Sequence, residues 1–233
     1  MFFLDPNYLL FMIPAFVLMM VAQFWVNSTY KRWGQKRNTY GISGADAARK
    51  LLSYASLTDV NVAPASGRLT DHYDPRDRTL HLSPEVAQGQ SVASLAIAAH
   101  EIGHAMQDKQ GYLPLRFRSA IVPAANLGST FGWILIFAGL LLRSFQLASL
   151  GLIVFSLGAV FALATLPVEL NASTRAKDLL KNSGMLYTAE ERSGVNSMLN
   201  AAAFTYVAAL ATAVMQVLYF GSLVGGMGGR RRS

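Results

Sequence analysis

The chain contains no cysteine, which excludes disulfide bonds and thiolate metal sites. Charged residues are also scarce at 14%, well below the roughly 25% that is typical of soluble domains. Hydrophobic residues reach 52% of the 233 positions, so the composition indicates a membrane protein. Any transition-metal site must therefore use imidazole and carboxylate groups. The chain has four histidines: His72, His81, His100 and His104.

Long uncharged runs predict where the chain crosses the membrane. Residues 7–26 carry no charge over the length that a helix needs to cross a bilayer. A signal peptide would instead have a basic segment before its apolar run. Here Asp5 precedes the run and a basic cluster follows it, which favours a retained anchor with its N-terminus outside. Residues 121–142 and 147–167 predict a tight helical hairpin, and residues 199–224 form a last apolar run.

The distribution of lysine and arginine predicts the orientation. Sixteen of these 20 residues fall between the first and second runs or within residues 168–198, which share one side if all four runs cross. The positive-inside rule places that side in the cytosol. Arginines 230–232 argue mildly the other way, so a re-entrant or interfacial 199–224 stays open. We interpret the basic excess as a topology signal with contact to anionic lipids, and predict no nucleic-acid partner.

The segments between the apolar runs predict short elements. Residues 44–57 read as an amphipathic helix, and 68–82 as two strands, RLTDHY and RTLHL, around the turn DPRD. Ser83 followed by Pro84 predicts one helix start, and Ser91 predicts the start of a helix that runs through His104 and ends before Gly111. Residues 168–182 predict an amphipathic polar helix.

The pattern H-E-x-x-H at His100, Glu101 and His104 is the main chemical signal. Positions i and i+4 share one helix face, so both imidazoles can bind one ion while Glu101 reaches a water on it. The pattern predicts a zinc hydrolase. The alternative is a helix whose histidines are ordinary core or surface groups.

A catalytic zinc needs a third protein ligand and one open position. The extended pattern with a third histidine is absent, because Gln107 to Gln110 follow the motif. Glu169 is the leading candidate: it follows the third apolar run, and two crossings return it to the side of His104. Stabilising a helix N-terminus is its alternative role. Glu190 and Glu191, which lie side by side in a predicted polar turn, are weaker candidates, and Asp178 is expected on the solvated side.

The segments AAHEIGHAMQ and LPVELNASTRA resemble those of the YugP-like neutral zinc metallopeptidases of bacterial membranes, which are similar in organisation to the HtpX-like membrane proteases. The resemblance covers nearly the whole chain. It implies that His100 and His104 are zinc ligands, that Glu101 is the catalytic acid and base, and that Glu169 is the third ligand. Ser173 stands where HtpX-like sequences tend to have aspartate, and we expect it to hydrogen-bond a ligand histidine more weakly.

The expected fold is mainly α and integral to the membrane. It has about four transmembrane helices and a cytosolic, zincin-like α+β metallopeptidase segment with a short β-hairpin. The expected domains are a transmembrane anchor (1–28), a catalytic segment with the HEIGH helix (29–119), a transmembrane hairpin (120–168), a cytosolic helix with the third zinc ligand (169–198), and a membrane segment with a basic tail (199–233).

The predicted function is a membrane-embedded endopeptidase of the cell (inner) membrane that hydrolyses peptide bonds through a water activated by one Zn²⁺ ion. Its partners are the bilayer and peptide or protein substrates, with membrane-protein quality control as a role that fits. Strand RTLHL is a candidate substrate edge, and Arg175, His72 and Tyr73 are candidate oxyanion stabilisers.

Three alternatives remain beside the cytosolic endopeptidase. One is a catalytically silent membrane scaffold that binds partners or regulates proteolysis, against which the intact Glu101 argues. An intramembrane protease would need a later aspartate ligand within a span, and the last three apolar runs contain none. A zinc transporter would need charged or histidine ligands within its spans, and the apolar runs lack these too.

Overall fold

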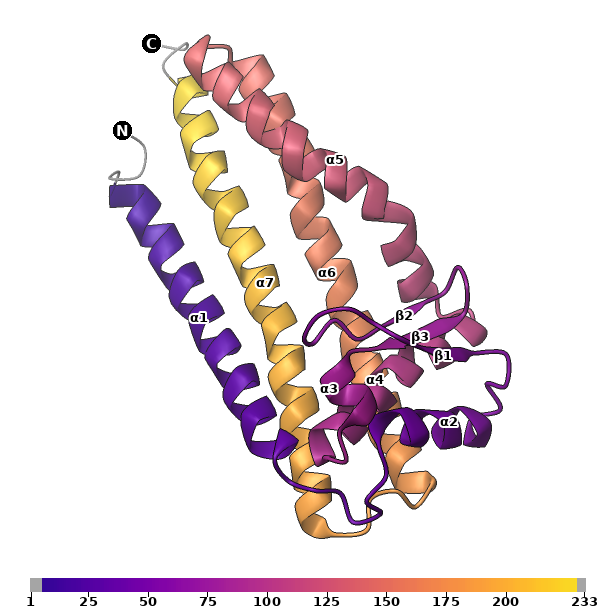
Figure 1. Ribbon diagram of the computed structural model, residues 1–233. Coiled ribbons are helices and arrows are strands. Elements are labelled where there is room, and N and C mark those ends of the chain that lie inside the picture. Colours follow the sequence, from indigo (N-terminus) through magenta and orange to yellow (C-terminus); the bar gives the residue numbers. More distant parts are fainter. Residues whose placement is uncertain (1–5, 230–233) are drawn as a thin grey trace. The chain divides into compact units, whose positions relative to one another are not determined.

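The computed structural model describes residues 6–229, and arginines 230–232, which bear on the predicted orientation, lie outside this range. Helices dominate the described chain, and three short strands form one sheet (Figure 1). The elements in chain order are α1 (Pro6–Gly34), α2 (Gly44–Tyr54), β1 (Asn61–Pro64), β2 (His72–Asp74), β3 (Thr79–Leu82), α3 (Pro84–Gln88), α4 (Val92–Lys109), α5 (Leu113–Leu141), α6 (Phe145–Asn182) and α7 (Ala189–Gly229).

The chain forms two compact units, each built from separate stretches of sequence. The apolar unit comprises Met1–Ala22, Arg116–Pro167 and Thr205–Ser233. The polar unit comprises Gln23–Leu115 and Val168–Phe204, and it contains the sheet, α2, α3, α4 and every predicted site residue. Helices α1, α5, α6 and α7 each contribute residues to both units.

Among the described residues, four helices, α1, α5, α6 and α7, are long and apolar enough to cross a membrane, which confirms the prediction of about four candidate transmembrane helices. Within the apolar unit α5 and α6 form the predicted hairpin (Figure 1). Two glycines allow their backbones to approach closely. A Cβ at Gly132 would lie 2.7 Å from Phe155, and one at Gly139 would lie 2.3 Å from the backbone nitrogen of Ala148. Small residues at such crossings are the usual means of packing helices in lipid.

Two helix boundaries differ from those predicted. The polar helix predicted at residues 168–182 is not separate, because α6 runs for 38 residues and includes Pro167 in its interior. The sequence changes from apolar to polar near Pro167, but the helix continues through this point. Helix α7 begins at Ala189, ahead of the predicted apolar start at residue 199.

The early start of α7 has a local cause in a reciprocal cap. The Thr188 hydroxyl accepts a hydrogen bond from the Glu191 amide at 3.1 Å, while the Glu191 carboxylate accepts one from the Thr188 amide at 3.0 Å. This capping box satisfies amides that the first helical turn leaves unpaired. The other Glu191 oxygen accepts from the Thr39 amide at 2.7 Å, and the exposed Glu190 pairs with Lys36. Glu191 is thus a capping residue rather than part of a polar turn.

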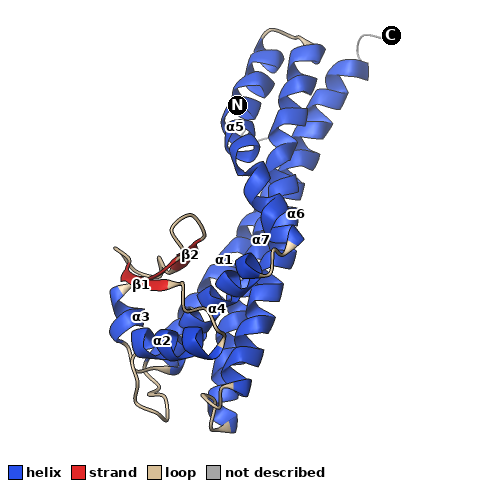
Figure 2. Ribbon diagram, turned by 90° about the vertical axis from the view of Figure 1, so that its right-hand side faces the viewer, coloured by secondary structure: helices blue, strands red, loops and turns tan. Residues whose placement is uncertain are grey.

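The sheet has the strand order β1-β3-β2 (Figure 1). Figure 2 shows its strands in red. Strands β2 and β3 form the predicted antiparallel hairpin, in which His72 lies opposite His81. Strand β1, which was not predicted, pairs with β3 in parallel. The prediction that RTLHL offers an edge to substrate is therefore wrong, because β3 is paired on both sides. The outer strands of this sheet are β1 and β2.

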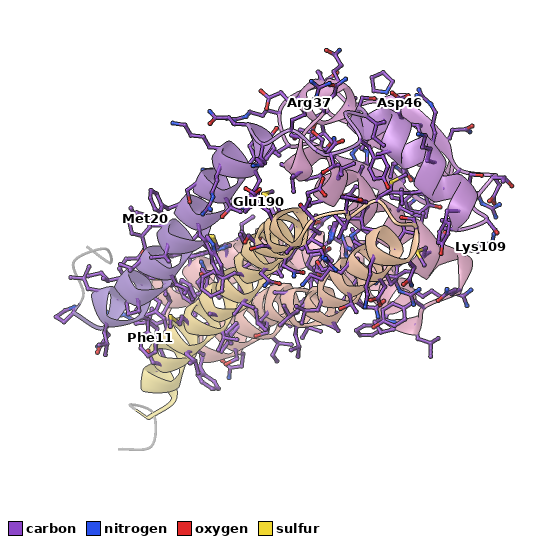
Figure 3. The ribbon with its side chains drawn as sticks, turned by 90° about the horizontal axis from the view of Figure 1, so that it is seen from below. Phe11, Met20, Arg37, Asp46, Lys109 and Glu190 are labelled. Carbon is purple, nitrogen blue, oxygen red and sulfur yellow. The ribbon has the colours of Figure 1, made fainter. Side chains whose placement is uncertain are left out.

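Helices α2, α3 and α4 share one hydrophobic core with the sheet. The predicted amphipathic helix is α2, which buries Ala47, Leu51 and Leu52. Ser83 begins α3 as predicted, but its hydroxyl does not cap that helix. It donates instead to the Asp71 carboxylate at 2.9 Å. Asp46 and Lys109 of this unit are exposed, and Figure 3 shows their side chains pointing outward from the ribbon.

Candidate metal centre

Helix α4 carries His100, Glu101 and His104 within the polar unit. Ser91 begins the helix as predicted, because its hydroxyl accepts a hydrogen bond from the Ser94 amide. The helix buries residues on most of its circumference, consistent with its run of alanine, leucine and isoleucine. The rings of His100 and His104 stand nearly perpendicular at 87°, with centroids 4.9 Å apart. Both imidazoles therefore face the same side of α4.

Glu169, on α6, meets these two histidines. Its Oε2 atom lies 3.2 Å from Nε2 of His100 and 3.5 Å from Nε2 of His104. The Glu169 side chain is almost fully buried. Among the described residues these three form a group whose ligand atoms all lie within 4.8 Å of one another. The structure thus brings together the three side chains that were predicted to share one ion.

Gly103 makes this meeting of α4 and α6 possible. A Cβ atom at Gly103 would lie 2.5 Å from the backbone oxygen of Ala172, which is closer than real Cβ contacts allow. The backbones of α4 and α6 are therefore in contact where Gly103, between His100 and His104, meets Ala172, close to Glu169. A short carboxylate side chain can reach the imidazoles only because no side chain separates the helices here.

Each imidazole has its second nitrogen held by a polar side chain. Nδ1 of His100 lies 3.3 Å from the Ser173 hydroxyl, which is the expected serine contact. Nδ1 of His104 lies 3.0 Å from Oε1 of Gln107, a partner that was not predicted. The spacing of three residues from His104 could have indicated Gln107, because i and i+3 share a helix face. With both Nδ1 atoms engaged, both Nε2 atoms face Glu169.

Glu101 is buried beside this group, with 9% of its surface exposed. Burial raises the pKa of its carboxyl above the ordinary value, although the charges of His100 and His104 act in the opposite direction. A buried carboxyl with a raised pKa holds and releases a proton closer to neutral pH than an exposed one does. Its surroundings therefore suit proton transfer.

The three predicted oxyanion stabilisers have other partners. The Tyr73 hydroxyl donates to Asp108 at 2.9 Å, and burial raises the pKa of this tyrosine. His72 is exposed and stacks on His81 with ring centroids 4.7 Å apart. Arg175 donates to Asn171 and Gln110, each at 2.7 Å. These contacts give each of the three a structural explanation that needs no substrate.

The donor set fits a zinc ion. Two imidazole nitrogens and one carboxylate oxygen are the protein ligands of several catalytic zinc sites, which keep a fourth position open for water or substrate. Softer sites built on thiolates are excluded by the lack of cysteine. The buried carboxylate of Glu169 between two imidazoles also supplies the negative charge that a divalent cation requires. The residues present are therefore consistent with one zinc ion.

Comparison with known proteins also indicates zinc chemistry. Residues 8–224 match the family described as "Putative neutral zinc metallopeptidase". The chain is 42% identical over 208 residues to the Bacillus subtilis (strain 168) protein named "Putative membrane protease YugP", covering 89% of this chain and 92% of that protein. No solved structure matches the chain. Because the family match spans most of the chain, including both segments of the centre, the protein belongs to the neutral zinc metallopeptidase family.

Proposed function

We propose that the protein is a zinc-dependent endopeptidase of the membrane, with His100, His104 and Glu169 as zinc ligands and Glu101 as the catalytic acid and base. The observation that carries the proposal is the convergence of both Nε2 atoms on the Glu169 carboxylate, with Glu101 buried next to them. The family membership supports zinc and peptide hydrolysis as the chemistry.

The residues of the chain would divide the reaction between them. Zinc, when bound, supplies Lewis-acid polarisation of the scissile carbonyl and lowers the pKa of water. Glu101 would accept a proton from the attacking water on a carboxylate oxygen, while the hydroxide adds to the scissile carbonyl carbon, and would then pass that proton to the amine that leaves. Its raised pKa supports this role, because a carboxyl that is too acidic would not hold the proton between the two steps. Glu169 and the two histidines remain fixed throughout.

An extended peptide would find its main-chain partners on β2 rather than on β3. Strand β2 pairs with β3 alone, so its other side is a candidate edge for an added strand. The hydrogen bond from Tyr73 to Asp108 ties β2 to α4, the helix that carries the histidines. This contact supports β2 as the segment that aligns substrate with the centre.

The setting we propose is the cell (inner) membrane with the centre on the cytosolic side. The lysine and arginine excess supports this orientation. The domain ranges derived from the sequence are retained as proposals, with residues 29–119 and 169–198 forming the catalytic part. Substrates would be peptides or proteins, including membrane proteins, and quality control is a role that fits such substrates.

The test uses the full chain purified in detergent or nanodiscs, with zinc content and cleavage of an unfolded protein measured in parallel. Wild type should bind one zinc and cleave. Glu101→Gln should bind zinc without cleaving, and Glu169→Ala should lose both properties. Glu190→Ala, which alters an exposed carboxylate, is the matched control and should behave as wild type. Cleavage that survives in Glu101→Gln would contradict the proposal, and zinc-loaded wild type without any cleavage would favour the scaffold alternative.

A further inference from the structure

Gln107 is a buried polar residue that the hydrolytic reaction does not itself require. Its side chain has no exposed surface, and it lies on α4 between His104 and the helix that carries Glu169. Its amide makes three contacts: 3.0 Å to Nδ1 of His104, 2.8 Å to the backbone oxygen of Val168, and 3.0 Å to Oδ1 of Asn171. Because buried polar groups are costly unless they are hydrogen-bonded, the orientation of this amide matters.

The Val168 contact fixes which way the amide points. A backbone carbonyl only accepts hydrogen bonds, so the end of the Gln107 amide that faces Val168 must be the NH₂ group. The carbonyl oxygen of Gln107 is then the end that faces His104. With the amide reversed, two oxygens would face each other at 2.8 Å in a buried site.

Arg175 fixes the same orientation by an independent route. Its guanidinium only donates, and its Nε atom lies 2.7 Å from the Asn171 amide, so Asn171 must present its oxygen there. The same oxygen is 3.0 Å from Gln107, which must therefore present its NH₂ group to it. The Val168 carbonyl, which only accepts, and the Arg175 guanidinium, which only donates, therefore require the same orientation of the Gln107 amide.

We propose that Gln107 is a positioning residue that keeps the Nδ1 proton of His104 engaged and fixes the ring, so that Nε2, on the side of Glu169, is the nitrogen offered to a zinc ion. The oxygen of Gln107 only accepts, so Nδ1 must be the donor in their contact. The Ser173 hydroxyl beside His100 can donate or accept and imposes no such choice. Arg175 and Asn171 act on His104 only through Gln107. The inference rests on the proposed zinc centre.

The first measurement is the zinc affinity of the purified full chain by competition with a chromophoric chelator. Gln107→Leu keeps the size of the side chain but cannot accept a hydrogen bond, and it should weaken zinc binding by about 10- to 100-fold, as loss of such partners usually does. Thr174→Ala is the matched control: it removes a hydroxyl of α6 that bonds only its own helix, and zinc affinity should not change. Ser173→Ala should weaken binding less than Gln107→Leu.

A second set of variants separates positioning from packing. Arg175→Met should weaken zinc binding by less than about tenfold, and Arg175→Lys, which still only donates, should restore most of the affinity. The double variant Gln107→Leu with Arg175→Met should bind zinc no more weakly than Gln107→Leu alone, because Arg175 acts through Gln107. The visible spectrum of bound Co²⁺ should change in Gln107→Leu and stay unchanged in Arg175→Lys.

The outcomes distinguish this inference from the proposed function. Wild type that binds no zinc would overturn both. Wild type that binds zinc, with Gln107→Leu binding it equally well, would overturn the role of Gln107 alone. Losses that multiply in the double variant would overturn the network, since Arg175 would then act by a separate route. If Gln107→Leu does not fold, the comparison of Arg175→Met with Arg175→Lys decides, and equal affinities in the two would overturn the inference.

Discussion

Two buried glutamates near the same histidines differ in what their carboxylates contact. Oε2 of Glu169 lies within 3.5 Å of an Nε2 atom of each histidine. For Glu101, burial is the largest influence on the carboxyl and raises its pKa. The sequence motif predicted that His100 and His104 share one helix face, and the crossing argument predicted Glu169 beside them; the structure brings these three side chains together. Gln107 was not predicted because its partners on α6 lie more than 60 residues away, and no local spacing relates them.

At the scale of single residues, Glu101→Asp should reduce kcat while leaving zinc affinity unchanged. The shorter side chain keeps a carboxylate but withdraws it from the reacting atoms, and misplacement by about 1 Å typically costs around 100-fold in rate. Steady-state kinetics and zinc titration of the purified variant check this. A loss of zinc in Glu101→Asp would mean that Glu101 helps to hold the ion.

At the scale of elements, hydropathy predicted the four long helices, and turn chemistry predicted the β2–β3 hairpin. Strand β1 was missed because Asn61–Pro64 is short, ends in proline and has a parallel partner that no turn signal reveals. The continuity of α6 was not predicted, because the change from apolar to polar residues near Pro167 resembles the boundary between two helices. The early start of α7 depends on a capping box in residues whose polarity predicts a turn.

The close approach of α4 and α6 at Gly103 leads to a prediction about zinc. Gly103→Ala should force the two backbones apart, at a cost of about 1–3 kcal/mol, and should weaken zinc binding because Glu169 moves away from the histidines. Gly158→Ala on α6 is the matched control, since a Cβ there meets nothing within 4 Å. Zinc affinity measured in both variants checks this, and equal affinities would show that α6 can shift without disturbing the centre.

The cap of α7 leads to a prediction about stability. Glu191→Ala should lower the unfolding free energy by about 0.5–2 kcal/mol, because the amides of Thr39 and Thr188 lose their acceptor. Glu190→Ala removes an exposed ion pair with Lys36 and should cost at most about 1 kcal/mol. Thermal unfolding of both variants checks the difference. Equal melting temperatures would argue against the capping role.

At the scale of the whole molecule, the proposed ion joins α4 to α6, two helices that are separated in sequence by α5. Removal of zinc by a chelator should therefore lower the melting temperature of wild type by several degrees, because an ion that binds only the folded state stabilises it. Glu169→Ala should melt at one temperature whether or not zinc is added. An unchanged melting temperature of wild type after addition of the chelator would mean that zinc contributes no stability.

The lack of cysteine allows a direct test of the proposed orientation. A single cysteine can be introduced in α2 (Lys50→Cys) or between α5 and α6 (Arg143→Cys), and both positions are exposed. In intact cells a membrane-impermeant maleimide should label Arg143→Cys, while Lys50→Cys should react only after permeabilisation. The unmodified chain is the background control. Labelling in the reverse pattern would place the catalytic part outside.

The contact between His100 and Glu169 joins residues that are 69 positions apart. At about 5–20 residues per second, a ribosome needs between about 3 and 14 seconds to synthesise that interval. During this time the nascent chain already carries the HEIGH helix but lacks the third proposed ligand. A chain that stops before α6 would therefore be an incomplete enzyme, so peptide hydrolysis could begin only after both helices of the hairpin had been synthesised.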